Sequence, residues 1–248
     1  MIKKIISTYA NNLYQDVMLR AYQQARSDIL DSIPPGGKCL DCGAGGGGQY
    51  HRLREISNSI VPENYVGLEW DVAGVLQAKK HGLNVIRGDL NRGLPFKDES
   101  FDCIFGLSVL EHLINGCHFL KEASRLLTPG GHLILITPNL SAWFNILLLG
   151  IGHMPSSGPH PDSVLLLRKN TPIQFREAGI SHVEDTFPID RHLVVFTFKV
   201  LRSYLKTLGF KRVAGKAYGV YPFPKFMQPL LEKIDPWHCH QMVFNCQK

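Results

Sequence analysis

Apolar residues recur along the chain at two spacings, and the alternation between these spacings predicts the fold. Residues 8–33 carry apolar side chains at intervals of three or four, among them Val17, Ala21 and Ala25, which predicts one or two amphipathic helices. The sequence "PPGG" that follows ends them. Short apolar runs typical of buried strands then alternate with helical segments up to residue 137.

This alternation gives an expected order of elements. We expect a strand near 38–42, a helix from about 48, a strand at 65–69, a helix at 72–81 and strands at 84–87 and 102–106, then a helix within 110–127 and a strand at 132–137. Right-handed crossovers join such elements into a parallel sheet with helices on both faces. The chain is therefore predicted to adopt a doubly wound α/β fold behind an N-terminal helical extension.

The alternation stops after residue 137. Residues 138–191 are rich in proline, glycine and histidine, and their apolar run "AWFNILLLGIG" is too short to cross a bilayer. An insertion at the carboxyl end of a strand lies where open α/β sheets bind ligands, so we expect a lid there. A helix over 197–210, stopped by Gly209, and a final strand in "HQMVFNCQK" follow.

These elements predict a single domain over residues 1–248. Its expected parts are N-terminal helices (1–36), a cofactor-binding core (37–137), a lid and acceptor region (138–191) and a C-terminal part that completes the sheet (192–248). Hydrophobic residues at 44% and charged residues at 19% exclude a disordered or fibrous protein. We expect a cytoplasmic location, because no signal peptide or membrane span is evident and the six cysteines fit a reducing compartment.

Positive charge is concentrated in the second part of the chain. Basic and acidic residues balance up to Ile136, so the net charge of +6 arises after it. No acidic residue interrupts the basic run of Lys199, Arg202, Lys206, Lys211, Arg212, Lys216 and Lys225. Most such runs are solvated faces, but this one also suits an anionic substrate or an anionic membrane surface.

Two short motifs suggest metal ligands without completing a site. Cys39 and Cys42 form a C-x-x-C motif, but no second pair completes a tetrahedral zinc site, and cysteine is a common small core residue. The motif His238-Cys239-His240 supplies too few ligands by itself. We therefore predict no metal at either motif.

The stretch "CLDCGAGGGGQYHRL" follows a predicted buried strand and is crowded with glycine. Glycines there let a ligand approach the backbone and the N-terminus of the next helix. Gly43, Gly45 and Gly48 also satisfy the G-x-G-x-x-G pattern of dinucleotide sites. Asp41, however, would repel a pyrophosphate by about 1–4 kcal/mol. It instead suits a ligand with an ammonium and a sulfonium, such as S-adenosylmethionine.

At these residues a family resemblance becomes plain. "LDCGAGGGG" resembles the D-x-G-x-G-x-G motif of class I S-adenosylmethionine-dependent methyltransferases, and "VGLEWD", "IRGDL", "FDCIFGLSVLEHL" and "ASRLLTPGGHLILITPN" resemble the family's later motifs in order, over residues 38–139. The resemblance implies a seven-stranded sheet of order 3-2-1-4-5-7-6 with the last strand antiparallel. It also implies cofactor contacts from Asp41, Cys42, Gly43, Ala44, Gly45, Glu69, Trp70, Asp89, Leu90, Leu107, Ser108 and His112.

Within these contacts, the resemblance assigns Glu69 to the ribose hydroxyls, Trp70 to the adenine and Asp89 to the adenine amino group. The segment "RHLVVFTFKVLRSYLKTLGFKRV" resembles the type 11, ubiquinone-biosynthesis-like small-molecule methyltransferases. It implies a small-molecule acceptor, and the basic run beside an apolar run suggests an amphiphilic or lipid-linked one at an anionic membrane. Which atom is methylated, oxygen, nitrogen or carbon, stays open.

Methyl transfer from a sulfonium is an in-line displacement, so the protein mainly aligns the reacting groups, and a base is needed only if the acceptor loses a proton. His112 is the best-placed candidate base, although a cofactor contact or a helix-capping role is equally compatible with its position. Glu111 either orients a neighbour or begins a helix. His160 and His192 flank the insertion and rank second.

Three other interpretations stay open. An RNA methyltransferase would use the basic C-terminal part, but no RNA-binding module is evident and nucleic acid is not expected. A non-catalytic protein that binds S-adenosylmethionine would keep the same cofactor motifs. A nicotinamide-dependent dehydrogenase would use the same glycines but conflicts with the position of Asp41.

Overall fold

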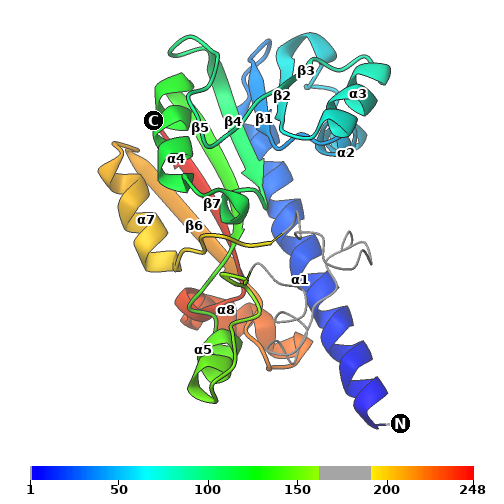
Figure 1. The fold of residues 1–248 in the computed structure, drawn as a ribbon, viewed down its shortest axis with the longest axis vertical. Helices are drawn as coiled ribbons and strands as arrows, with labels where there is room; N and C mark the ends of the chain where they lie inside the picture. The colour runs from blue at the N-terminus through cyan, green and yellow to red at the C-terminus, as the bar shows by residue number, and fades with distance from the viewer. Residues whose placement is uncertain (1, 162–190) are drawn as a thin grey trace.

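The computed structural model describes residues 2–161 and 191–248, arranged around a seven-stranded sheet (Figure 1). The strands lie in the order β3-β2-β1-β4-β5-β7-β6. β7 runs antiparallel to both β5 and β6, whereas β1 to β5 pair in parallel. The predicted doubly wound fold and its strand order are confirmed. The strands are β1 (Cys39–Cys42), β2 (Tyr65–Glu69), β3 (Val85–Arg87), β4 (Phe101–Leu107), β5 (Leu127–Pro138), β6 (Arg212–Tyr218) and β7 (Gln241–Gln247).

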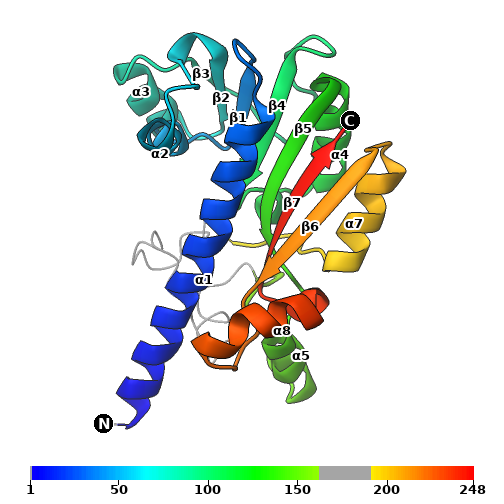
Figure 2. The same cartoon turned by 180° about the vertical axis from the view of Figure 1, so that it is seen from behind.

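Helices cover both faces of the sheet, and each face has its own apolar core (Figure 2). One face carries α1 (Ile2–Ser32), α2 (Gly48–Ile56) and α3 (Val72–Lys80), and the other carries α4 (Gly116–Leu126) and α7 (Phe198–Thr207). α5 (Trp143–Gly150) and α8 (Gln228–Ile234) lie at one end of the molecule. Short 3₁₀ segments are η1 (Pro62–Asn64), η2 (Leu110–His112), η3 (Lys225–Met227) and η4 (Pro236–His238).

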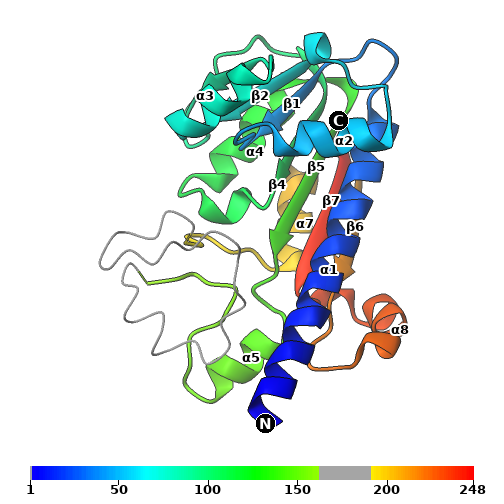
Figure 3. The same cartoon turned by 90° about the vertical axis from the view of Figure 1, so that its right-hand side faces the viewer.

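The N-terminal extension is one continuous helix, where the sequence allowed for one or two. Val17, Ala21, Ala25 and Ile29 recur every four residues, so they share one face of α1, and all four are fully buried. The small side chains of Ala21 and Ala25 let the helix axis lie close to β4, β5 and β7 (Figure 3). This packing brings the polar residues beside that face to the carboxyl ends of the central strands.

The order of strands reverses between β1 and β4, which are neighbours in the sheet. In open α/β sheets a ligand binds in the crevice outside the carboxyl ends of the strands at this reversal. The glycine turn follows β1, and the segment that contains Ser108, Glu111 and His112 follows β4. The fold thus places both sequence-predicted site segments at one crevice.

Several elements differ from the sequence prediction in detail. The helix expected within 110–127 is divided into η2 and α4, and the strand expected at 132–137 already begins at Leu127. β6 and α8 were not predicted from the local pattern. Residues 162–190 of the predicted lid lie outside the described residues, and the division into parts stays a prediction. No helix in the described ranges is long and apolar enough to cross a membrane.

Candidate active site

The glycine turn after β1 is held by backbone hydrogen bonds on one side and is open at Gly45 on the other. The backbone N–H groups of Gly43 and Ala44 both donate to the carbonyl of Leu68, at 2.8 and 3.2 Å. A Cβ added to Gly43 would lie 2.6 Å from Val109, which closes that side. Gly45 has a φ of +52°, and a Cβ there would meet no heavy atom within 4 Å. A ligand can therefore approach the backbone at Gly45, as the sequence predicted.

The structure buries Asp41 behind this turn, not at its edge. Its carboxylate is 2% exposed and accepts a hydrogen bond of 2.7 Å from the hydroxyl of Tyr65. Burial raises the pKa of Asp41 to about 7, against the lowering effect of the Tyr65 hydrogen bond. The alternation of side chains along β1 explains the position, because Leu40 and Cys42 face one core and Asp41 faces the side of Tyr65. Its contact with the cofactor stays a prediction.

Glu69 connects the glycine turn to the end of β2. One carboxylate oxygen accepts from the backbone N–H of Gly45 and the other from that of Asp71, each at 2.7 Å. These bonds fix the carboxylate beside the glycine turn, and both oxygens keep further lone pairs for hydroxyl donors. Trp70 beside it is 62% exposed and lies under the Arg87 guanidinium, 5.9 Å from the ring centroid.

The segment after β3 carries one acid and one apolar residue of the predicted cofactor contacts. Asp89 accepts a hydrogen bond from the backbone N–H of Asn91 at 2.9 Å and lies 3.3 Å from the Nε of Arg92. Leu90 is buried. Their sequence-predicted roles at the adenine stay predictions.

α1 closes the crevice over the end of β4. The hydroxyl of Tyr22 donates to the Oγ of Ser108 at 3.1 Å, across 86 residues of sequence. Ser108 has a φ of +58°, the left-handed region that a residue with a Cβ rarely adopts. Backbone strain of this kind is concentrated at ligand sites, which agrees with the prediction that Leu107 and Ser108 contact the cofactor.

One turn further along α1, Arg26 is a cation that sequence analysis did not single out. It is 7% exposed, its Nε donates to the side chain of Gln49 at 3.2 Å, and its Nη2 has no hydrogen-bond partner in the part of the chain that the structure describes. Burial, together with the nearby Arg52, lowers the pKa of Arg26. Gln49 lies in the first turn of α2, directly after the glycines. The available signal was a charged residue beside Ala25, on the buried side of the helix.

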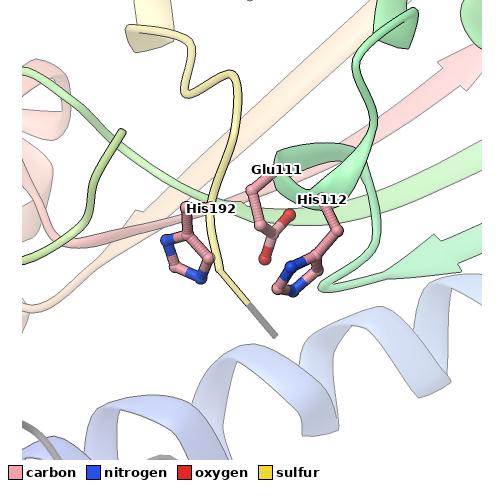
Figure 4. A group of neighbouring side chains, drawn as sticks. All are labelled: Glu111, His112 and His192. Carbon is pink, nitrogen blue, oxygen red and sulfur yellow. The ribbon is translucent and has the colours of Figure 1, made fainter. Parts of the chain in front are cut away.

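On the other side of the crevice, Glu111, His112 and His192 form a cluster (Figure 4). One ligating atom of each side chain lies within 4.8 Å of those of the other two, and the carboxylate of Glu111 lies between the two rings. Glu111 is 2% exposed and accepts a hydrogen bond of 2.9 Å from Thr137. Burial raises the pKa of Glu111, while both imidazoles act in the opposite direction.

The structure brings together the three histidines that the sequence offered as candidate bases. His112, the first-ranked base, and His192, of second rank, have ring centroids 5.1 Å apart. His160 is stacked on the far side of His192, at 4.9 Å. Sequence analysis did not join these residues, because the chain between them has no recognisable pattern.

The C-x-x-C motif and the His-Cys-His motif lie among core residues and polar contacts. The thiols of Cys39 and Cys42 are buried and unpaired, and burial raises the pKa of Cys39 to about 12. His238 contacts Asp235, and the ring of His240 packs between Tyr14 and Phe144. Within the described ranges, neither motif belongs to a group of three ligating side chains.

Comparison with known proteins connects this geometry to a domain family. Residues 40–135 match the family model described as a methyltransferase domain. A phthiotriol/phenolphthiotriol dimycocerosates methyltransferase of Mycobacterium leprae is 38% identical over 98 residues, which cover 38% of this chain and 34% of that protein. The Mycobacterium tuberculosis protein of the same name is 35% identical over 112 residues, covering 42% and 39%. The matched part thus spans little more than a third of these curated relatives.

Solved structures show the same fold over nearly the whole chain. A protein of Thermotoga maritima, described as an S-adenosylmethionine-dependent methyltransferase and possible histamine N-methyltransferase, aligns with a TM-score of 0.55 and 18% identity, covering 99% of this chain and 98% of its own. An S-adenosylmethionine-dependent methyltransferase of Methanosarcina mazei gives a TM-score of 0.53 at 18% identity, covering 89% and 96%. At 18% identity, these alignments show a shared fold and nothing more specific.

Proposed function

We propose that this chain, which carries an S-adenosylmethionine-dependent methyltransferase domain of the class I, type 11 group, is an enzyme that methylates a small amphiphilic acceptor. The observation that carries the proposal is the arrangement around the glycine turn at the reversal between β1 and β4, with the bare backbone at Gly45, the fixed carboxylate of Glu69 and the buried guanidinium of Arg26 beside Gln49. Each of these features matches a different part of the methyl donor.

The residues around the glycine turn fit the parts of S-adenosylmethionine. The donor's amino-acid tail ends in a carboxylate, and Arg26 offers a buried guanidinium nitrogen without a hydrogen-bond partner among the described residues. A buried guanidinium nitrogen without a hydrogen-bond partner is costly, and a carboxylate ligand would remove that cost. The carboxylate of Glu69 would accept hydrogen bonds from the ribose hydroxyls, and Trp70 and Asp89 would flank the adenine.

The bound donor supplies a methyl group already activated by the positive charge of its sulfur. The chain itself has to position the two reactants and exclude water. Tyr22 and Ser108 close the crevice from the α1 side, and Glu111, His112 and His192 lie at the carboxyl end of β4, on the acceptor side. Alignment of this kind contributes several kcal/mol to catalysis without any covalent step by the protein.

A base would be needed if the acceptor is a hydroxyl, and His112 is the candidate. Its Nδ1 contacts the carbonyl of Arg191 at 3.1 Å. A carbonyl oxygen only accepts, so Nδ1 holds a proton, and in the neutral form of the ring the lone pair is on Nε2. An imidazole nitrogen with a lone pair is a base that can receive the proton of an acceptor hydroxyl.

An amphiphilic acceptor is supported by the surface formed by α5, α8 and the segments next to them. Large apolar side chains are exposed over this surface, and Phe226, at 83%, is the most exposed of them. The others are Trp143, Leu147, Leu149, Ile151, Leu230, Ile234 and Trp237. Exposed apolar patches mark sites for apolar ligands, partners or membranes.

Charges beside this surface favour an anionic membrane or a lipid-linked acceptor. Lys199 lies 4.4 Å from the ring centroid of Trp237 and so supplies positive charge next to the exposed apolar side chains. The relatives from Mycobacterium, named for methylation of phthiotriol and phenolphthiotriol dimycocerosates, are compatible with an acceptor of this kind.

Calorimetry of the full chain with S-adenosylhomocysteine and with NAD tests the cofactor assignment. We expect saturable binding of the first and none of the second. Incubation with labelled S-adenosylmethionine and lipid extracts should then give products heavier by one methylene. Preference for NAD would support a dehydrogenase, and cofactor binding without turnover on any fraction would support a non-catalytic binding protein.

A further inference from the structure

We propose that Glu111, His112 and His192 bind one divalent transition-metal ion of the zinc class. In the function proposed above, on which this inference rests, the ion holds the oxygen of the acceptor. Sequence analysis predicted no metal, because it had no means of bringing His192 to the "EH" pair after β4. The three side chains meet only in the folded chain, at the carboxyl end of β4 (Figure 4).

The hydrogen bonds around the cluster set the imidazoles for metal binding. The Nδ1 of His112 contacts the carbonyl of Arg191 at 3.1 Å, and the Nδ1 of His192 contacts that of Ser157 at 2.6 Å. Carbonyl oxygens cannot donate, so both Nδ1 atoms carry protons, and Nε2 is the nitrogen through which each ring, when neutral, can bind a metal ion. A bond from the second ring nitrogen to a backbone carbonyl is the usual arrangement of histidines that ligate metals.

The carboxylate is supported in the same way. The hydroxyl of Thr137 donates to Oε2 of Glu111 at 2.9 Å, so each of the three side chains has a partner outside the cluster. The three ligand groups are therefore oriented from outside the cluster, as the outer partners of a metal site orient its ligands.

The donor set and the distances indicate which kind of ion fits. Two imidazole nitrogens and one carboxylate oxygen are the ligands of catalytic zinc sites, which keep a fourth position open. Ligand atoms in a tetrahedral zinc site lie roughly 3.3 Å apart, given metal–ligand distances of about 2.0–2.1 Å. The present atoms lie within 4.8 Å of one another, so rotation of the side chains has to bring them only about 1.5 Å closer.

The open position gives the ion its role. A hydroxyl oxygen bound there loses its proton to water more readily, because the metal stabilises the resulting alkoxide or phenoxide. That oxygen then forms a bond to the donor's methyl carbon, the carbon–sulfur bond breaks and its electron pair returns to sulfur. The inference selects an oxygen acceptor from the three atoms that the sequence left open.

The test uses the tag-free full chain, stripped with a chelator and titrated with Co²⁺ as a spectroscopic probe. We expect one equivalent to bind, with the visible absorption of four- or five-coordinate Co²⁺. Glu111→Gln and His192→Gln should abolish this stoichiometric binding. Thr137→Val keeps all three ligands and removes one outer partner, so it should weaken binding by about 10- to 100-fold. His118→Gln, at an exposed histidine outside the cluster, should bind Co²⁺ like the wild type.

The outcomes are separable. Absence of Co²⁺ binding by the wild type, or unchanged binding in all three cluster variants, would overturn the metal site. Thermal melting identifies variants that fail to fold, and Thr137→Val tests the site even if the ligand variants do not fold. Acetohydroxamate, an oxygen-donor probe, should change the Co²⁺ spectrum; no change would refute the open position and the role in binding the acceptor.

Calorimetry of the metal-free wild type with S-adenosylhomocysteine separates this inference from the proposed function. Retained cofactor binding without metal binding would overturn the metal site alone. Absence of cofactor binding would instead contradict the methyltransferase assignment.

Discussion

Replacing Arg26 by methionine should weaken cofactor binding and leave the ligand-free protein at least as stable as before. The side chain is 7% exposed, and burial disfavours its charged form. Its Nη2 has no hydrogen-bond partner in the described ranges, and its Nε donates to the side chain of Gln49 at 3.2 Å. Methionine keeps an unbranched apolar stem and removes the charge.

The two expected effects have opposite signs. A hydrogen bond to a charged group contributes about 1.5–3 kcal/mol, so loss of the bond to the ligand's carboxylate should raise the Kd about 10- to 150-fold. In the free protein, removing a buried unsatisfied donor gains about 1–3 kcal/mol, while losing the Gln49 bond costs about 1 kcal/mol. The free energy of unfolding should therefore rise by between zero and about 2 kcal/mol.

Two ligands that differ in the amino-acid tail separate the contact of Arg26 with the tail from its other effects. Calorimetry with S-adenosylhomocysteine reports the full contact, whereas 5′-methylthioadenosine lacks the whole amino-acid tail. The substitution should weaken binding of S-adenosylhomocysteine and leave the affinity for 5′-methylthioadenosine unchanged. Urea unfolding of the free protein measures the change in the free energy of unfolding. Arg52→Met, at an exposed arginine in α2 that acts electrostatically on Arg26, is the matched control and should change neither affinity.

Equal weakening of both ligands would refute the assignment, because it would mean that Arg26 supports the crevice without touching the tail. Unchanged affinity for S-adenosylhomocysteine would refute it as well.

Three further predictions concern the cofactor rim, the buried acid and the apolar surface. Glu69→Ala should weaken S-adenosylhomocysteine by about 1–3 kcal/mol in calorimetry, since charge-assisted bonds to the ribose are lost; an unchanged Kd would contradict the ribose role. The pKa of Asp41, at about 7, lies above its ordinary 3.8, so the native state keeps a proton that the unfolded chain releases. Stability should then fall from about pH 4 to about pH 7 and level off above, and Asp41→Asn should remove this slope in urea melts; a slope shared by the variant would show another origin. Phe226→Ser should reduce flotation with anionic liposomes, measured against the wild type and neutral liposomes; equal flotation would exclude this surface as the contact.

Much of the fold follows from local sequence. The strand "CLDC", the glycines after it and the helix from Gly48 are within one short segment, and the positive φ at Gly45 is a requirement that a single residue satisfies. The spacing of apolar residues in α1 likewise gave the buried face of the helix, because periodicity is a property of neighbouring residues. The order of the sheet came from the family resemblance and was confirmed.

The sequence by itself thus determined the elements, the glycine turn and which residues along the chain are candidates for the cofactor. Only the tertiary structure decided that Asp41 faces Tyr65, that Arg26 reaches the first turn of α2 and that His192 meets Glu111 and His112. The physical reason is that periodicity defines the buried face of an element but not its shift or rotation on the sheet. Those two quantities depend on packing between segments far apart in sequence, and they set which charged side chains meet.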